Sequence, residues 1–121
     1  MTQTILTVDD SRTMRDMLKM ALAEAGFNVL QAVDGVDGLE VLRASTPDVI
    51  VTDINMPKMD GFGLIEAVRK DNRYRKVPIL VLTTESDAAK KMRAKEAGAT
   101  GWIVKPFEPT KLIAAIRRVA A

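Results

Sequence analysis

Neither cysteine nor histidine occurs in this chain of 121 residues. The absence of cysteine excludes disulfide bonds and thiolate metal sites. The absence of histidine removes the commonest general base, the usual zinc ligand and any phosphohistidine formed on the chain itself. A metal site here must therefore use oxygen ligands, which favour magnesium, manganese or calcium.

Long hydrophobic runs are also absent, since no apolar segment approaches the roughly 20 residues of a membrane-spanning helix. The first four residues lack the basic start and apolar core of a signal peptide. We therefore expect a cytoplasmic protein with no membrane contact. The net charge is only +2, and basic residues must gather on one face to bind nucleic acid, so we expect no nucleic-acid partner.

Short apolar runs alternate five times with stretches of helical periodicity. The length suits one domain, so residues 1–121 are expected to form a single domain without an output domain. The apolar runs predict strands, several of them buried on both faces, at residues 4–8, 28–32, 48–53, 77–83 and 101–105. Helices are predicted at about residues 14–25, 35–44, 64–68, 86–97 and 109–119, with Ser86 as the N-cap of the fourth.

Five β–α units of this kind predict an α/β fold with a parallel sheet and helices on both faces. Ligands of such folds bind at the carboxyl ends of the strands. Three acids, a lysine and a threonine sit at the carboxyl ends of predicted strands here, namely Asp9, Asp10, Asp53, Lys105 and Thr83. Parallel strands would bring these groups to one edge of the sheet.

The charged cluster carries a net charge of about −2 before anything binds. Carboxylates crowded together repel unless a cation or a proton intervenes, and Mg²⁺, or Mn²⁺ in its place, needs only a few protein oxygens. Asp53 could act as a nucleophile toward phosphorus, and Lys105 could neutralise charge on the transferred group. Taken alone, the pair Asp9-Asp10 would more often be a helix cap, and Lys105 a solvated lysine.

Three further residues have both a structural and a functional interpretation. The hydroxyl of Thr83 could bind a phosphoryl oxygen, although threonine is common in strands. Trp102 is at least as well explained by covering the sheet edge as by a switch. The backbone carbonyl of Asn55 could bind the metal, since irregular backbone beside a site often does so.

These residues stand within an ordered set of motifs: Asp9-Asp10, Thr13-Met14-Arg15, Asp53, Asn55-Met56-Pro57, Asp60-Gly61, Thr83 and Val104-Lys105-Pro106-Phe107. Together they resemble the signature of a response-regulator receiver domain, over essentially the whole chain, and most closely the single-domain, CheY-like chemotaxis regulators. The resemblance implies a flavodoxin-like (βα)5 three-layer sandwich with five parallel strands in the order 2-1-3-4-5.

The resemblance also implies roles for the matching residues. Asp53 would accept a phosphoryl group from the phosphohistidine of a histidine kinase, and Lys105 would pair with Asp53 or its phosphate. Asp10, Asp53 and the Asn55 carbonyl would hold Mg²⁺, with Asp9 acting through water. Thr83 would move toward the phosphoryl group and let Trp102 swing inward, and Glu85 and Asn55 would influence the lifetime of the phosphorylated form.

Two departures from the family pattern concern the partner surface. Trp102 stands where a tyrosine or phenylalanine is usual, and the fourth helix is unusually basic, with Lys90, Lys91, Arg93 and Lys95. A charge run is usually a solvated face. Here it suggests an acidic partner surface, which makes the flagellar motor switch a less secure target. A monomer is expected.

The leading hypothesis is a phosphorylation-operated switch, not an enzyme. The same resemblance allows a receiver that drains phosphate from a shared kinase, or a regulator of a non-flagellar partner. A phosphohydrolase would usually carry a second aspartate where Asn55 stands. A flavin or nucleotide site would need a phosphate cradle after the first strand, and Asp9-Asp10 would repel phosphate there. A phosphate-blind interaction domain is disfavoured because every matched position is intact.

Overall fold

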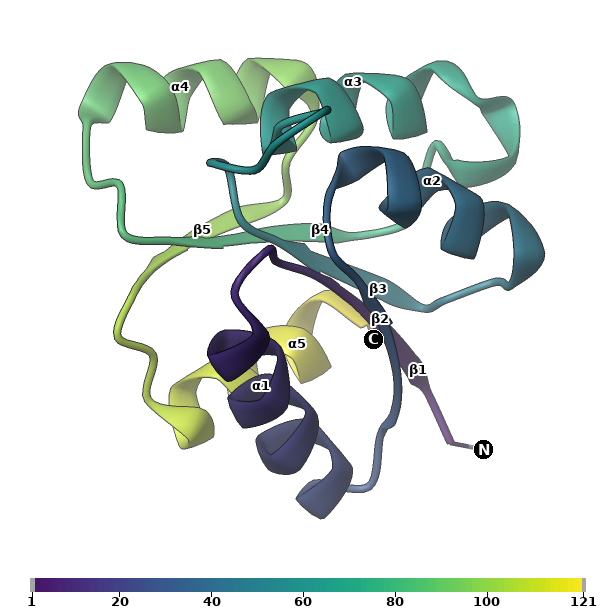
Figure 1. The fold of residues 1–121 in the computed structure, drawn as a ribbon, viewed down its shortest axis with the longest axis vertical. Helices are drawn as coiled ribbons and strands as arrows, with labels where there is room; N and C mark the ends of the chain where they lie inside the picture. The colour runs from purple at the N-terminus through teal and green to yellow at the C-terminus, as the bar shows by residue number, and fades with distance from the viewer. Residues whose placement is uncertain (1, 121) are drawn as a thin grey trace.

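A computed structural model describes residues 2–120 as one sheet of five parallel strands flanked by helices (Figure 1). The strands lie in the order β2-β1-β3-β4-β5, which confirms the predicted topology. Their bounds are β1 Thr4–Val8, β2 Asn28–Ala32, β3 Val49–Thr52, β4 Ile79–Thr83 and β5 Gly101–Val104.

Helices cover both faces of the sheet (Figure 1). One layer holds α1 (Arg12–Glu24) and α5 (Pro109–Ala120), and the other holds α2 (Gly35–Ala44), α3 (Gly61–Lys70) and α4 (Ala88–Ala97). A short 3-10 helix, η1, spans Asn72–Tyr74. Each layer encloses its own hydrophobic cluster, so the sheet separates two cores.

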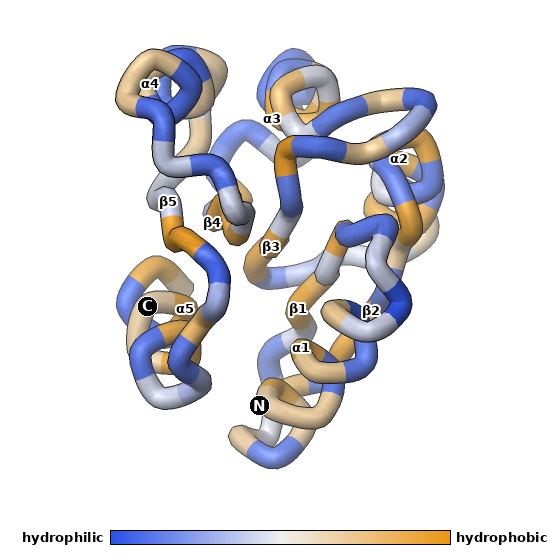
Figure 2. The backbone as a smooth tube through the Cα atoms, turned by 60° about the vertical axis from the view of Figure 1, so that its left-hand side comes forward, coloured by the Kyte–Doolittle hydropathy of each residue, from blue (hydrophilic) through white to orange (hydrophobic). Residues whose placement is uncertain are grey.

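The central strands are buried on both faces, as their continuous apolar sequences predict. All residues of β3 and β4 are buried, and the strands form a hydrophobic centre in the hydropathy view (Figure 2). Three predicted strands were too long, because β3 ends at Thr52, β4 begins at Ile79 and β5 ends at Val104. Asp53 and Lys105 therefore lie in the loops just beyond their strands.

Side-chain caps start most of the helices. Ser11, Asp34, Asp60 and Asp87 each accept a hydrogen bond from a backbone N–H group in the first turn of α1, α2, α3 and α4. The prediction of Ser86 as the N-cap of α4 was wrong by one residue. Both residues are good caps, and the carboxylate of Asp87 accepts from the N–H of Ala89 at 2.8 Å.

Helix α4 buries only one of its residues, Ala94, against the core. Its C-terminus ends at Gly98 in the left-handed region, with φ of 119°, where glycine is favoured. Arg69 of α3 lies directly against Gly98 and donates from Nε to its carbonyl at 3.0 Å. Arg69 also donates from Nη1 to the carbonyls of Tyr74 and Arg75, so one guanidinium joins the segments before β4 and after α4.

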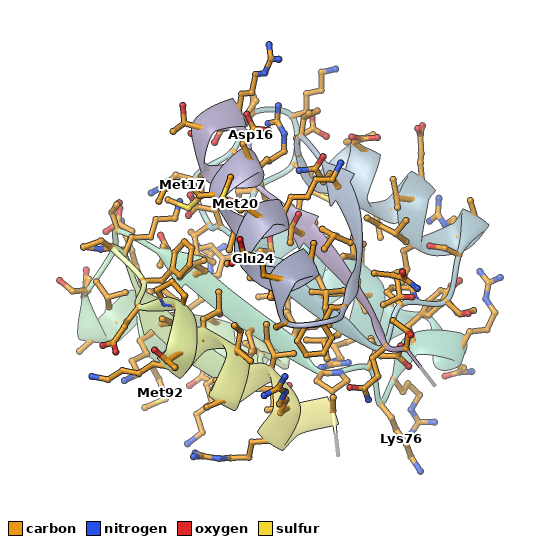
Figure 3. All side chains as sticks on the ribbon, turned by 90° about the horizontal axis from the view of Figure 1, so that it is seen from below. Asp16, Met17, Met20, Glu24, Lys76 and Met92 are labelled. Carbon is orange, nitrogen blue, oxygen red and sulfur yellow. The ribbon has the colours of Figure 1, made fainter. Side chains whose placement is uncertain are left out.

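Helix α1 presents an outward face that is partly hydrophobic (Figure 3). Met17 and Met20 are 51% and 67% exposed on this face, next to Asp16. The opposite face of α1 buries Leu18 and Leu22 in the core. These buried residues dock α1 on the sheet, and the loop with Asp9 and Asp10 lies directly before its first residue, Arg12.

Candidate functional site

Three carboxylates meet at the carboxyl edge of the sheet, as predicted. Asp9 and Asp10 follow β1, and Asp53 follows the neighbouring strand β3. One oxygen from each lies within 4.8 Å of the others. The paired register of Val8 with Thr52 places the two loops side by side, which explains why residues more than 40 positions apart converge.

Lys105, in the loop after the edge strand β5, bridges two of these carboxylates. Its Nζ lies 2.9 Å from Asp9 Oδ2 and 2.9 Å from Asp53 Oδ2. Its side chain is only 9% exposed, and its peptide bond to Pro106 is cis. The expected Lys105–Asp53 contact is present, and the contact with Asp9 is an addition that the sequence did not indicate.

The environment of Lys105 favours its charged form. Burial lowers the pKa of Lys105, but its hydrogen bonds to Asp53 and Asp9 outweigh burial and hold the pKa above its ordinary value. The ammonium therefore remains a fixed positive charge between two nearly buried carboxylates. One positive charge against three negative ones leaves the site able to accept a cation.

Asp53 is held by backbone as well as by Lys105. Its Oδ1 accepts a hydrogen bond from the N–H of Ile54 at 2.6 Å, and its side chain is 11% exposed. Gly61, the first residue of α3, packs against the Asp53 carbonyl so closely that any Cβ there would clash with it. The glycine thus lets α3 approach the loop that aims Asp53 at the edge of the sheet.

Asp9 is held by hydrogen bonds to its side chain and to its backbone carbonyl. Its Oδ1 accepts from the N–H of Ser11 at 2.9 Å, and its carbonyl accepts from Arg15 Nη1 at 2.8 Å. Asp9 is 2% exposed, whereas Asp10 is exposed. The sequence indicated Arg15 only as part of a motif, and its role in fixing the Asp9 loop was missed because the contact reaches back from the first turn of α1.

Glu85, in the loop after β4, joins Asn55 to Lys90. Its Oε1 accepts from Asn55 Nδ2 at 3.0 Å and lies 3.1 Å from Lys90 Nζ. The hydrogen bond from Asn55, followed by that from Lys90, lowers the pKa of the Glu85 carboxyl group below its usual value. Asn55 and Glu85 were expected near the site, whereas the link to Lys90 was not.

Thr83 and Trp102 both contact the backbone of Glu85. Thr83 is fully buried at the end of β4, and its Oγ1 accepts from the N–H of Glu85 at 3.3 Å. The indole Nε1 of Trp102 donates to the Glu85 carbonyl at 3.1 Å. The partly buried indole therefore ties β5 to the loop after β4.

Lys91 lies outside this cluster. It is exposed on α4, where it lines, with Trp102, a hollow of about 240 Å³ between α4 and β5. The structure thus brings together all the predicted carboxylates, Lys105 and Asn55 at or beside one site. It places Lys91 on the adjoining surface.

The ligand atoms suit a hard divalent cation. Every carboxylate in the cluster offers oxygen, which Mg²⁺ prefers, and Asp10 is exposed enough to leave room for metal-bound water. No soft or nitrogen ligand competes, because the sequence holds no cysteine or histidine. The residues present therefore fit Mg²⁺.

The chain is similar to known proteins in sequence and in fold. A family model described as "Response regulator receiver domain" matches residues 5–117. "Chemotaxis protein CheY1" of Helicobacter pylori strain J99 is 44% identical over 110 residues, covering 89% of each chain. "Probable transcriptional regulator ycf27" of Guillardia theta is 41% identical over 115 residues, which are 95% of this chain and 44% of that protein.

A solved structure of Vibrio cholerae chemotaxis protein CheY4 superimposes with a TM-score of 0.94 at 44% identity, covering 98% of this chain and 99% of the other. The match therefore covers the five-stranded fold over nearly the whole chain. Fold, sequence and family model agree over nearly all the described residues, and this chain belongs to the response regulator receiver domain family.

Proposed function

We propose that this protein is a phosphorylation-operated switch of a two-component system in which Asp53 accepts a phosphoryl group. The observation that carries the proposal is the position of Asp53. Its nearly buried carboxylate lies within 4.8 Å of two further acids and 2.9 Å from the ammonium of Lys105. The chain belongs to a family of signalling proteins, so we propose a signalling role for this site and not a classical enzymatic activity.

The phosphoryl transfer uses Asp53 as the nucleophile. An oxygen of Asp53 forms a bond to phosphorus while the bond from phosphorus to a kinase histidine nitrogen breaks, and that nitrogen keeps the electron pair. Lys105, held as a cation, pairs with the added negative charge. Asp10, Asp53 and the Asn55 carbonyl would hold Mg²⁺, with Asp9 acting through water, and the ion would neutralise charge on the transferring group.

The switch would act through Thr83 and Trp102. A phosphoryl group adds about −1.5 to −2 charge and new acceptor oxygens beside the buried Thr83 hydroxyl. If Thr83 turns toward that group, its hydrogen bond from the Glu85 N–H is released. The same loop accepts the indole N–H of Trp102, so the change would reach β5 and the surface of α4.

The partners follow from the relatives and from surface charge. The similarity to CheY1 and CheY4 supports a chemotaxis-type histidine kinase as donor. On the receiving side, Lys90 and Lys91 on α4 favour an acidic partner surface. This charge makes the flagellar motor switch a less secure target, and binding to it is to be tested beside binding to a non-flagellar partner. A receiver that only drains phosphate from its kinase would bind no downstream target in either state.

Intact-mass analysis after treatment with a small phosphodonor and Mg²⁺ tests the phosphorylation site. We expect one phosphoryl adduct, which a chelator prevents and which Asp53→Asn abolishes. Asp16→Asn, an exposed aspartate on the outer face of α1, is the matched control and should retain the adduct (Figure 3). An adduct that persists in Asp53→Asn would disprove the assigned site.

A further measurement separates the switch from a phosphohydrolase. The side chain of Asn55 cannot exchange a proton near neutral pH, and here its amide donates to Glu85. We therefore expect no rapid multiple turnover of an ordinary phosphate monoester. Turnover of such a monoester at an enzymatic rate would overturn the switch proposal.

A further inference from the structure

Glu85 is the meeting point of four segments around the site. Its N–H donates to Thr83 at the end of β4, and its carbonyl accepts from Trp102 on β5. Its carboxylate accepts from Asn55 in the loop after β3 and pairs with Lys90 in the first turn of α4. The side chain of Glu85 is therefore held from two directions while its backbone is held from two others.

The two side-chain contacts share one oxygen. Asn55 Nδ2 and Lys90 Nζ lie 3.0 Å and 3.1 Å from the same Oε1 of Glu85. Lys90 thereby offsets the negative charge of Glu85 at the atom that Asn55 also uses. Without this cation, Glu85 would face the charge of a phosphorylated Asp53 with only a neutral amide to hold it, and like charges repel.

The Asn55–Glu85 hydrogen bond spans the side of the site that faces α4. β3 and β4 are neighbours, so Asn55, two residues after Asp53, lies beside Glu85, two residues after Thr83. The opposite side is closed by Asp9 and Lys105. Water that reached the phosphoryl group from the α4 side would meet the bridge between Asn55 and Glu85.

Loss of the phosphoryl group is a hydrolysis. A water oxygen forms a bond to phosphorus, the bond from phosphorus to the Asp53 oxygen breaks, and the Asp53 carboxylate keeps the electron pair. The products are the carboxylate and inorganic phosphate, which takes both protons of the water before any is released to solvent. The rate of this step depends on how freely water reaches the phosphorus atom.

We infer that Lys90 is a positioning residue for this hydrolysis: through Glu85 it keeps the Asn55–Glu85 bridge closed and so prolongs the phosphorylated state. The inference rests on the proposed phosphorylation of Asp53 and adds a residue that touches neither phosphate nor metal. It gives one lysine of the basic α4 helix a role different from that of its neighbours.

The decay of the phosphoryl adduct, followed by intact mass after removal of the phosphodonor, tests the inference. In low salt we expect Lys90→Gln to lose phosphate about two- to fivefold faster than the wild type, the range that loss of one ion pair near the surface can produce. Lys90→Arg retains the charge and should decay at nearly the wild-type rate. Lys95→Gln removes an exposed lysine from the same helix, and it should leave the decay unchanged.

Ionic strength distinguishes positioning from a general structural effect. Raising NaCl from about 0.01 M to about 1 M shortens the Debye length from about 30 Å to about 3 Å, which weakens a partly exposed pair such as Lys90–Glu85. We expect salt to accelerate decay in the wild type and in Lys95→Gln, and much less in Lys90→Gln. A merely structural lysine would leave the salt dependence of the three proteins equal.

Two results would contradict the inference in different ways. An adduct that decays from Lys90→Gln at the wild-type rate or more slowly overturns the role of Lys90 and leaves phosphorylation of Asp53 intact. Failure of the wild type to form any adduct overturns the proposed function, and the inference with it. Circular dichroism of each variant checks that the fold is retained.

Discussion

Asp10 offers a test in which stability and metal binding move in opposite directions. Its carboxylate oxygen lies within 4.8 Å of oxygens of Asp9 and Asp53, and it is the most exposed of the three acids. Within residues 2–120 no side chain or backbone group donates a hydrogen bond to it. Asp10→Asn therefore removes a repelling charge without breaking a contact.

The size of the effect follows from the geometry of the cluster. Two unit charges 4.8 Å apart repel by about 1 kcal/mol in water and by about 3 kcal/mol at an effective dielectric constant of about 20. Asp10 is exposed, so the lower value applies, and Lys105 already offsets one of the two neighbouring charges. We expect Asp10→Asn to raise the free energy of unfolding in a chelator by about 1 kcal/mol, or the melting temperature by about 4 °C.

Mg²⁺ should reverse this order. An ion that binds only the folded state stabilises it by about 2.7 kcal/mol at a concentration of 100 times its Kd. Asp10→Asn weakens the site and so loses much of this gain. The wild type should therefore be the more stable protein in saturating Mg²⁺ and the less stable one in chelator.

Urea unfolding followed by far-ultraviolet circular dichroism, with and without Mg²⁺, measures both effects. Asp16→Asn is the matched control, because Asp16 is an exposed aspartate on the outer face of α1 (Figure 3). Its stability relative to the wild type should be the same in both conditions. The reasoning fails if Asp10→Asn is destabilised in chelator, or if Mg²⁺ stabilises it as much as the wild type.

Three further predictions concern the groups that hold the site together. In the presence of a chelator, Lys105→Met should lower the free energy of unfolding by about 3–5 kcal/mol, because two nearly buried carboxylates lose their cation. Urea unfolding measures this loss, and an unchanged stability would contradict it. The pKa of Lys105 is raised in the folded state, so its contribution to the free energy of unfolding is complete below the unfolded pKa of about 10.4. This contribution is lost as the pH rises through the folded pKa, and stability should therefore fall less at alkaline pH in Lys105→Met than in the wild type. Gly61→Ala should lower the free energy of unfolding by about 1–3 kcal/mol in thermal unfolding, because the added Cβ would clash with backbone atoms. In Gly63→Ala the added Cβ meets chiefly a flexible side chain, so the loss should be smaller, and equal losses would contradict this explanation.

The sequence predicted the edge of the sheet well, and physical reasons explain why. Buried strands have continuous apolar sequences, so β1 and β3 were identified with the acids that follow them. Parallel strands place these ends together, so the sequence alone predicts the cluster of Asp9, Asp10 and Asp53 that the structure shows. The order of the strands came from the resemblance, because periodicity does not specify which strands are neighbours.

Contacts between loops were not predictable in the same way. Lys105–Asp9 joins two loops and Glu85–Lys90 joins a loop to the first turn of α4, and no spacing in the sequence encodes either contact. The start of α4 was misplaced because Ser86 and Asp87 are both suitable caps. Few apolar residues mark this helix in the sequence, and Ala94 alone of its residues is buried.

The shallow burial of α4 has a consequence for local unfolding. Because little apolar surface of α4 packs on the core, polar contacts at its two ends help to hold it. They are the Lys90–Glu85 ion pair near its N-terminus and the hydrogen bond from Arg69 to Gly98 at its C-terminus. Segments with few buried contacts open at a free energy far below that of global unfolding. The amides of α4 should therefore exchange with deuterium sooner than those of α3, which buries five residues. The helix beside the proposed phosphorylation site is then expected to open before α3 does.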